Sequence, residues 1–388
     1  MRHPWLALLV LVCSAMPGCS DIEETDLDGD GIVDSEDNDM DGDGFNNTVE
    51  AECNSDSSIY NSTPQDMDND GYCDSIDTDI DGDGLPNDWE EDVGLNPLDE
   101  SDGIECHGMA EYCPRSYDNF TFPETHNSFS TIEDGVWMAV NHYTALQAQW
   151  DGGIRSFMLD THHLSKEEKE PDDVRFCHGD PNSGLFYPCI YSEVDAFSWL
   201  SQFGSLMNNS SGDVVSLLLE NYVPGEHIEY LFERTGMKER AFVRVPGAPW
   251  PSIGEMILNG TDLVVYWDYQ YDERFPWLHH AWTHSWDTPY GESEPSQMSC
   301  RVGRGDGEQT VWHLNNWLSS IYGQGDPVRS NDVNDYDTLL NRSLDCWEKV
   351  GDRPTFIAVD FWENGEIVNV TVTLNKMANW SDEIPSHP

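Results

Sequence analysis

The sequence predicts an α/β protein whose larger part is a parallel (β/α)8 barrel, preceded by a small acidic region with little regular secondary structure. Beyond residue 107, short apolar runs alternate with segments of helical length, which is typical of parallel α/β folds. That part spans about 280 residues, a length that suits a barrel of eight strands. A doubly wound sheet is the alternative, but no Gly-rich GxGxxG turn follows the first predicted strand.

The chain is strongly acidic. Its 388 residues include 74 Asp and Glu against 18 Lys and Arg, a formal net charge of −56. Residues 20–105 contribute 31 acidic residues and no basic one. Such a surface repels nucleic acid and anionic lipid headgroups, so we expect no nucleic-acid partner. Divalent cations are the expected partners of this much carboxylate.

The first 19 residues have the features of an export signal. Arg2 provides a positive start, and residues 5–12 form an apolar run too short to span a bilayer. Residues 16–19 resemble a bacterial lipobox, in which Cys19 is lipidated and becomes the mature N-terminus. We therefore expect an exported protein, either a bacterial cell-envelope lipoprotein attached to a membrane through Cys19 or an extracellular protein. Ordinary signal cleavage nearby is the alternative.

The remaining cysteines fit an exported chain. If Cys13 leaves with the signal and Cys19 carries lipid, eight remain, and an even number in an exported protein indicates disulfides. Eight cysteines allow many pairings. We expect the pairing that joins neighbours in sequence, namely Cys53–Cys73, Cys106–Cys113, Cys177–Cys189 and Cys300–Cys346.

Residues 20–105 contain four loops with the spacing of calcium-binding loops. Each begins Asp-x-Asp-x-Asp-Gly, and an acidic or amide residue follows at positions 9 and 12. These are the ligand positions of a calcium loop, with Gly providing the sharp turn at position 6. The predicted calcium ligands, loop by loop, are Asp26, Asp28, Asp30, Asp34 and Asp37; Asp39, Asp41, Asp43, Asn47 and Glu50; Asp66, Asp68, Asp70, Asp74 and Asp77; and Asp79, Asp81, Asp83, Asn87 and Glu90.

The first pair of loops repeats after 40 residues, so the region is a duplicated unit. The pattern resembles thrombospondin type 3 repeats, and EF-hands fit less well because no clear helix precedes each loop. The resemblance implies a calcium-stiffened stalk between the lipid anchor and the larger domain. Without calcium, we expect the clustered carboxylates to repel one another and expand the segment. A disordered acidic linker is the alternative interpretation.

The larger region, residues 107–388, contains apolar runs that predict strands. They cover residues 120–125, 155–159, 174–177, 214–219, 241–245, 263–267 and 355–359. Predicted helices lie over residues 136–150, 194–207 and 309–321. Residues 277–286 contain three Trp and three His. This cluster could form a pocket wall, a rim that contacts a membrane, or part of the core, and the sequence leaves these alternatives open.

Chemically active residues follow five of these strands, namely His126, Asp160, His178, Glu220 and Asp360. A polar residue after one strand is most often a turn former or a helix cap. In a barrel, however, the carboxyl ends of the strands converge on one site. Two His and three carboxylates at such ends therefore predict a shared active site.

These segments resemble, in order, the motifs of the X domain of phosphatidylinositol-specific phospholipases C. The matching stretches are residues 125–128 (THNS), 153–160, 177–179 (CHG), 218–220 and 359–375. The resemblance implies a distorted TIM barrel and metal-assisted cleavage of phosphatidylinositol or a related inositol phosphodiester. In that reaction the substrate's own 2-hydroxyl attacks phosphorus, which gives a cyclic inositol phosphate and diacylglycerol.

The resemblance also implies roles for individual residues. His178 would protonate the leaving group, and His126, oriented by Asp360, would abstract the proton or stabilise the phosphate. Histidine suits both roles because its unperturbed pKa is about 6.5. Arg155 is expected to be structural, as a buried Arg paired with a carboxylate.

The ligands of an active-site calcium follow from the same resemblance. Asn127, Asp160 and Glu220 match three of the four ligands of calcium-dependent members, whereas metal-independent members have Arg in place of Asp160. Met158 occupies the position of the remaining ligand, a Glu. We therefore expect weaker calcium binding, or substitution by another oxygen such as one from Asp180 or Asp268.

Two other functions stay open at this point. A glycerophosphodiester phosphodiesterase shares the barrel and the two-His chemistry, but that family usually has Arg where this chain has Asn127. A catalytically weak surface module that binds calcium and ligands without turnover is supported by Met158. The presence of both His126 and His178 is the main evidence against it.

Overall fold

The computed structural model describes residues 25–388 except 168, 180–187, 191, 270–271 and 321–324. The predicted export signal and Cys19 lie outside the described residues. Contacts divide the chain into two compact units, Met1–Gly82 and Asp83–Pro388. In the described part of the chain, no helix is both long enough and apolar enough to cross a membrane.

The first unit is built from turns that carboxylates stabilise. A short helix, α1 (Asn47–Glu52), begins at position 9 of the second predicted calcium loop. The side chain at position 9 of each of the first three loops accepts a hydrogen bond from the backbone N–H at position 2. These bonds join Leu27 to Asp34, Met40 to Asn47 and Met67 to Asp74, at 2.8–2.9 Å. Because side chains satisfy the backbone in this way, the region needs little regular secondary structure, as predicted.

The loops of this unit associate in pairs. A Cβ atom at Gly42, in the second loop, would lie 2.7 Å from Oδ2 of Asp28 in the first loop. Gly82 has the same relation to Asp68, also at 2.7 Å. Both glycines have positive φ, at 72° and 75°, so two constraints favour Gly there. The element that the sequence repeats after 40 residues is therefore a pair of loops.

The second unit contains a curled sheet of eight parallel strands in the order β7-β6-β5-β2-β1-β10-β9-β8. Within the described residues, β7 and β8 do not pair, so the barrel is open there. The predicted distorted (β/α)8 barrel is confirmed. The strands are β1 (Phe122–Thr125), β2 (Ser156–His163), β5 (Val215–Asn221), β6 (Leu263–Trp267), β7 (Leu278–His280), β8 (Trp286–Asp287), β9 (Trp312–Asn315) and β10 (Phe356–Val359).

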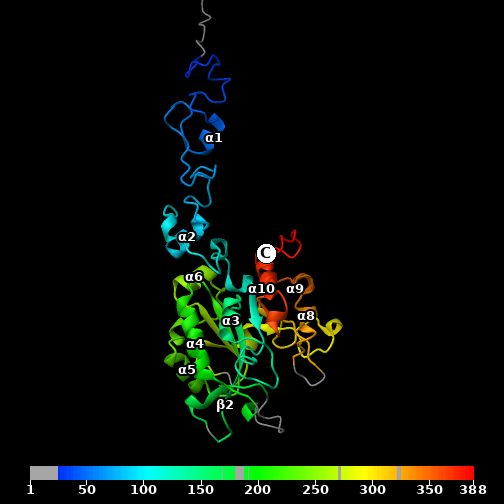
Figure 1. Ribbon diagram of the computed structural model, residues 1–388. Helices are drawn as coiled ribbons and strands as arrows, with labels where there is room; N and C mark the ends of the chain where they lie inside the picture. Colours follow the sequence, from blue (N-terminus) through cyan, green and yellow to red (C-terminus); the bar gives the residue numbers. More distant parts are fainter. Residues whose placement is uncertain (1–24, 168, 180–187, 191, 270–271, 321–324) are drawn as a thin grey trace, which may run out of the picture. The chain divides into compact units, whose positions relative to one another are not determined.

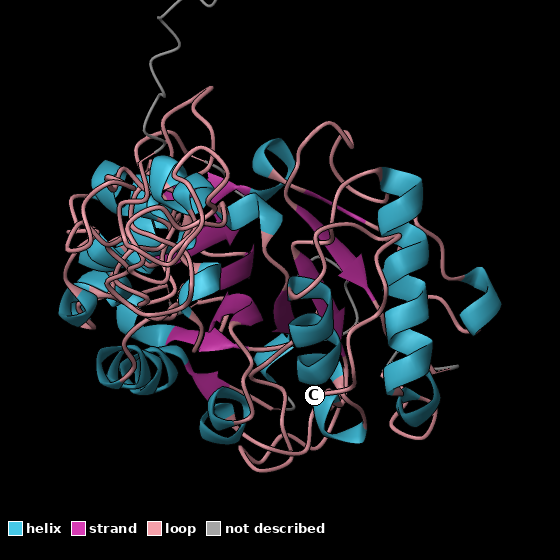
Figure 2. Cartoon of the chain, turned by 90° about the horizontal axis from the view of Figure 1, so that it is seen from above, coloured by secondary structure: helices cyan, strands magenta, loops and turns pink. Residues whose placement is uncertain are grey.

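Helices surround the strands on the outside (Figure 2), with α4 and α5 along one side of the barrel and α9 and α10 along another (Figure 1). The helices of this unit are α2 (Asn87–Val93), α3 (Leu146–Asp151), α4 (Ala196–Asn209), α5 (Gly225–Arg234), α6 (Ile253–Leu258), α7 (Ala281–His284), α8 (Ser330–Val333), α9 (Tyr336–Val350) and α10 (Ile367–Asn375). The longest two begin at Asp caps, Asp195 for α4 and Asp335 for α9, whose carboxylates accept first-turn N–H bonds.

Successive side chains of each strand point alternately to the outside and the inside of the barrel, and so form two separate apolar clusters. Leu217 and Leu219 of β5 pack outward with the helices, in a cluster that includes Phe203. Leu218 points the other way, into an inner cluster with Tyr266 and Phe356. Burial on both faces explains why the strand sequences read as continuous apolar runs.

Residues 83–113 belong to the barrel unit. Leu85, Cys106 and Cys113 are fully buried in the inner cluster, and the indole of Trp89 donates to the hydroxyl of Ser252 at 3.2 Å. The composition of the chain changes near residue 105, where we predicted the domain boundary. Contacts place the division earlier, after Gly82.

Three predicted elements differ in the structure. Residues 136–145 form bends and irregular structure with one bridge at His142, and the helix predicted over 136–150 is confined to α3. The helix predicted over 309–321 is replaced by strand β9, because residues 312–315 are buried between β8 and β10. The strand predicted over 241–245 is reduced to a single bridge between Ala241 and Leu263. In each case, tertiary pairing or its absence overrides the local pattern.

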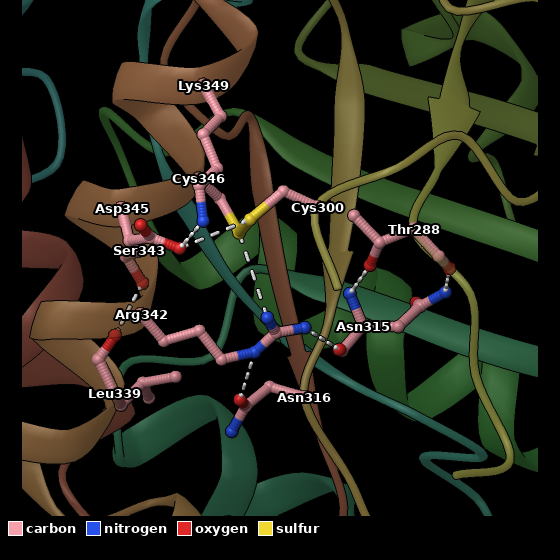
Figure 3. The surroundings of a disulfide bond; sticks show 10 residues. All are labelled: Thr288, Cys300, Asn315, Asn316, Leu339, Arg342, Ser343, Asp345, Cys346 and Lys349. Carbon is pink, nitrogen blue, oxygen red and sulfur yellow. Dashed lines mark hydrogen bonds and ion pairs between the residues drawn. A yellow bond between two sulfur atoms is a disulfide. The ribbon is translucent and has the colours of Figure 1, made fainter. Parts of the chain in front are cut away.

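All four predicted disulfides form: Cys53–Cys73, Cys106–Cys113, Cys177–Cys189 and Cys300–Cys346. The one of longest sequence separation, Cys300–Cys346, ties the segment after β8 to α9 (Figure 3). Beside it, Arg342 of α9 donates to the backbone oxygen of Asn315 at 2.9 Å and to Oδ1 of Asn316 at 3.0 Å. This end of β9 is therefore fixed covalently and by charge-assisted hydrogen bonds.

The structural role predicted for Arg155 is testable. Its Nε lies 3.0 Å from Oδ1 of Asp213, which also contacts Nδ1 of His107 at 3.2 Å. We expect Asp213→Asn to lower the free energy of unfolding by about 3 kcal/mol, because it leaves a mostly buried guanidinium without its counter-charge. Denaturant unfolding would measure this, with the exposed Glu239→Gln as the matched control. Equal stability of the two variants would contradict the assignment.

Candidate functional site

A pocket opens at the carboxyl ends of β1, β2, β5 and β6. Its wall includes a histidine, an amide, three carboxylates, one guanidinium and two aromatic rings. The lining residues are His126, Asn127, Met158, Leu159, Asp160, Leu218, Glu220, Asp268, Tyr290, Arg304 and Trp317. The structure therefore brings together most of the residues that the sequence predicted for a shared site.

His126 follows β1 and is held from two sides. Its Nδ1 lies 2.9 Å from Oδ1 of Asp360, and its ring stacks on Trp317 with centroids 4.1 Å apart and planes 6° apart. Asn141 donates to the same Asp360 oxygen at 2.7 Å. Donation from Nδ1 to the carboxylate leaves Nε2 as the acceptor nitrogen of the neutral ring.

The backbone around Asp360 is strained. The next residue, Phe361, has a φ of 48°, a value rare for a bulky side chain. Its N–H donates to the backbone oxygen of Asn141 at 2.6 Å, and buried His142 donates from Nε2 to the backbone oxygen of His126 at 2.8 Å. The turn of residues 141–142 thus connects the ends of β1 and β10 and fixes the His126–Asp360 pair.

His178 reaches the site by a different route. It follows β3 (Val174–Phe176), which is antiparallel to the end of β2 and pairs in turn with β4 (Val194–Asp195). We predicted that His178 follows a barrel strand; instead it follows a strand of an added antiparallel hairpin. Its Nδ1 lies 2.8 Å from Nδ2 of Asn127 and 3.4 Å from Oδ2 of Asp160. Burial alone would lower the pKa of His178, but the hydrogen bond and charge of Asp160 outweigh it and raise the pKa.

Three carboxylates lie in one row across adjacent strands. Asp160 of β2 is paired in register with Glu220 of β5, and Asp268 follows Trp267, the partner of Leu219. Burial and then the charge of Asp160 raise the pKa of Glu220. Burial and then the charge of Glu220 raise the pKa of Asp268 to about 7. The carboxylates thus repel one another along the row.

Arg304 is a pocket residue that the sequence did not reveal. Its guanidinium lies between the rings of Trp282 and Tyr290, at 4.2 and 4.5 Å from their centroids. Its Nε and Nη2 donate to Oδ2 of buried Asp287 at 2.8 and 2.6 Å. The segment has no periodic pattern, so nothing local signals that Arg304 folds into the pocket.

The donors at the pocket suit calcium. Asp160 and Glu220 offer carboxylate oxygens, and Asn127 offers an amide oxygen once its nitrogen contacts His178. Calcium prefers such an all-oxygen set. Met158 is buried in the pocket floor and offers no oxygen. Asp180, one of the two substitutes that we considered, lies outside the described residues, whereas Asp268 lies in the pocket.

In the acidic repeats, the first three ligands of each loop come together. Oxygens within each of the groups Asp26/Asp28/Asp30, Asp39/Asp41/Asp43, Asp66/Asp68/Asp70 and Asp79/Asp81/Asp83 lie within 4.8 Å of one another. Glu50, at position 12 of the second loop, is fully buried, and its Oε2 has no hydrogen-bond partner among the described residues. Asp34, Asn47 and Asp74 instead use an oxygen to bind the backbone.

The aromatic and His cluster of residues 277–286 is mostly core. Trp277, Trp286 and His279 are buried, and His279 donates from Nε2 to the backbone oxygen of Phe242 at 3.0 Å. Trp282 is the member that approaches the pocket, through Arg304.

The fold and the site define the class of protein. The family model described as PI-PLC X 1 matches residues 112–375, more than half of the chain. The chain therefore belongs to the PI-PLC X domain family.

Two relatives from Arthroderma benhamiae are similar over most of the chain. An "Uncharacterized secreted protein" is 24% identical over 299 residues, which cover 70% of this chain and 64% of that protein. The chain thus spans less than two thirds of this relative's length. A "PI-PLC X domain-containing protein 1" is 23% identical over 301 residues, covering 73% of this chain and 93% of that protein. Four disulfides in this chain are typical of an exported protein.

Solved structures give a weaker likeness. A mutant of the phosphatidylinositol-specific phospholipase C from Staphylococcus aureus has a TM-score of 0.46 at 11% identity, covering 69% of this chain and 95% of that one. A calcium-dependent phosphoinositol-specific phospholipase C from Pseudomonas sp. has a TM-score of 0.34 at 10% identity, covering 64% of this chain and 91% of that one.

The buried His279 predicts a pH dependence of stability. Burial, together with nearby His284 and Arg244, lowers its pKa to about 4. Since the unfolded pKa is about 6.5, the unfolded state binds more protons between these values. Stability should fall as the pH falls from 6.5 to 4, by on the order of 3 kcal/mol from this residue. Denaturant unfolding of His279→Gln should give a flatter pH profile, and exposed His387→Gln should not. Identical profiles for His279→Gln and the unmodified protein would refute this assignment.

Proposed function

We propose that the barrel is a calcium-dependent phosphodiesterase that cleaves phosphatidylinositol, or a related inositol phosphodiester, by attack of the substrate 2-hydroxyl. The observation that carries the proposal is the pair of oriented histidines beside the carboxylate row. His126 is fixed by Asp360, and His178 is fixed by Asn127 and Asp160. Membership of the PI-PLC X family supports this class of reaction.

His126 is suited to be the general base. Because its Nδ1–H donates to Asp360, the lone pair of the neutral ring is on Nε2. That nitrogen takes the proton of the 2-hydroxyl as the oxygen bonds to phosphorus. Asp360 then stabilises the imidazolium that forms. Stacking on Trp317 keeps the ring plane fixed during the transfer.

His178 is suited to be the general acid. When Nδ2 of Asn127 donates to its Nδ1, the proton of the neutral ring lies on Nε2. That proton passes to the diacylglycerol oxygen as its bond to phosphorus breaks.

Asn127, Asp160 and Glu220 would hold the calcium. When bound, the ion supplies positive charge for the phosphate and for the attacking hydroxyl. Asn127 has a φ of 48°, which Asn tolerates better than most residues, and this turn lets its amide face both His178 and the pocket. One side chain thereby links the acid to the metal site.

The acidic repeats are proposed to bind calcium as well, and Cys19 to carry a lipid anchor that holds the exported chain at a membrane. The grouped Asp oxygens and the buried Glu50 support the first proposal. The carboxylates of each loop would otherwise repel one another at short range.

The activity is testable with the full chain and phosphatidylinositol in mixed micelles. We expect calcium-dependent release of cyclic inositol phosphate, followed by ³¹P NMR, and its loss in EGTA. His178→Ala should lower kcat by about 10²–10⁴-fold, the usual contribution of a general acid. Exposed His387→Ala should retain activity.

Two outcomes would contradict this proposal. Turnover unchanged in His178→Ala would remove the acid from the mechanism. Cleavage of glycerophosphodiesters, with no inositol phosphodiester turned over, would assign the barrel to the other phosphodiesterase reaction.

Glu50 gives a test of the repeats. Calorimetric titration of the full chain with calcium should show one tight site fewer in Glu50→Gln, because the loop loses its buried position-12 carboxylate. Glu52→Gln, in the same helix but exposed, is the matched control. Unchanged binding in Glu50→Gln would show that this loop does not hold calcium.

A further inference from the structure

Asp268 lies level with the two predicted carboxylate ligands. Parallel pairing places Asp160 opposite Glu220, and the ladder continues to the next strand through a hydrogen bond from the N–H of Asp268 to the backbone oxygen of Leu219, at 3.1 Å. In return, the N–H of Asn221 donates to Oδ1 of Asp268 at 3.1 Å. These bonds orient the Asp268 carboxylate at the end of β6, where it lines the same pocket.

Without Asp268, the oxygens left for a cation are few. Asp160 uses Oδ2 to contact His178, and Glu220 accepts the Tyr222 hydroxyl on Oε1 at 2.5 Å. One oxygen of each remains, together with the amide oxygen of Asn127. Calcium takes six to eight oxygens, of which water and substrate supply some. Oδ2 of Asp268 is a fourth protein oxygen, from a fourth segment of the chain.

The row below the carboxylates provides no oxygen to the pocket, because Met158 and Leu218 are apolar and the hydroxyl of Tyr266 donates to that of Tyr117. Met158, Leu218 and Tyr266 are in register there, two residues before Asp160, Glu220 and Asp268 respectively. Met158 and Leu218 form the buried floor of the pocket. A cation held by Asp160 and Glu220 therefore gains no oxygen from the floor, and the next available one along the row is Asp268.

Arg304 forms only a long ion pair with Asp268. The nearest guanidinium nitrogen, Nη1, lies 3.8 Å from Oδ2 of Asp268, beyond hydrogen-bond distance. The same guanidinium makes two short hydrogen bonds to Asp287, which is fully buried. Its charge is thus balanced by Asp287, and Asp268 retains an oxygen for a cation.

We propose that Asp268 is a ligand of the active-site calcium, together with Asn127, Asp160 and Glu220. Asp268 supplies the oxygen that Met158 cannot. The inference rests on the proposed calcium dependence of the barrel and names the residue that makes the site competent. It assigns β6, in addition to β1, β2 and β5, to the metal site.

Binding of terbium(III), a luminescent substitute for calcium, tests this without an activity assay. Trp317 lines the pocket, so tryptophan-excited luminescence that disappears in Trp317→Phe reports on this site rather than on the acidic repeats. We expect Asp268→Asn to weaken that component by about tenfold or more, since affinity follows ligand charge. Asp272→Asn removes the same charge from a carboxylate that pairs with Arg274 and should leave binding unchanged. Calcium should displace the terbium in the unmodified protein.

A reciprocal variant separates loss of a ligand from loss of structure. Met158→Glu places a carboxylate on the pocket side of β2, so the double variant Met158→Glu with Asp268→Asn should regain most of the affinity. Terbium binding that is equal in the unmodified protein and Asp268→Asn would overturn the role of Asp268 alone. Absence of any Trp317-dependent signal in the unmodified protein would overturn both this role and the proposed calcium dependence.

Discussion

Parallel register at the carboxyl ends of the strands is the constraint on which the site depends. β2 lies between β1 and β5, and its pairing sets Asp160 level with Glu220 on one side. On the other side, β1 pairs with both β2 and β10, which places His126 next to Asp360. Because a strand shifted by one residue would turn these side chains away from the pocket, the apolar pairing below them also fixes the chemistry above.

Charge balance distinguishes the buried ion pairs of the barrel from the row of carboxylates in the pocket. Arg155 is matched by Asp213, Arg240 by Asp262 and Arg304 by Asp287. The row of Asp160, Glu220 and Asp268 has weaker partners: Arg304 lies 3.8 Å from Asp268, and His178 lies 3.4 Å from Asp160. Basic residues are scarce in a chain of net charge −56. The proposed calcium ion would supply the positive charge that stabilises this row.

The two histidines are fixed by different kinds of structure. His126 is held by strand ends, a stacked ring and the strained turn at Phe361. His178 depends on an antiparallel hairpin that leaves the barrel and on the Cys177–Cys189 disulfide beside it. The proposed general base thus follows a barrel strand, whereas the proposed general acid is carried by an added hairpin.

The sequence by itself determined the class of fold, the paired acidic loops and the residues at the strand ends, because these follow from local periodicity and short fixed spacings. The disulfide partners could also be predicted from the sequence, since each cysteine pairs with its neighbour along the chain. Tertiary structure decided the rest. Residues 312–315 became a strand because two other strands pair with them, and His178 came from a hairpin because β3 runs antiparallel to β2. Arg304 entered the pocket because Asp287 and two aromatic rings hold it there, and Asp268 joined the carboxylates through the register of β6 with β5. Each of these depends on contacts between segments distant in sequence, which no local pattern records.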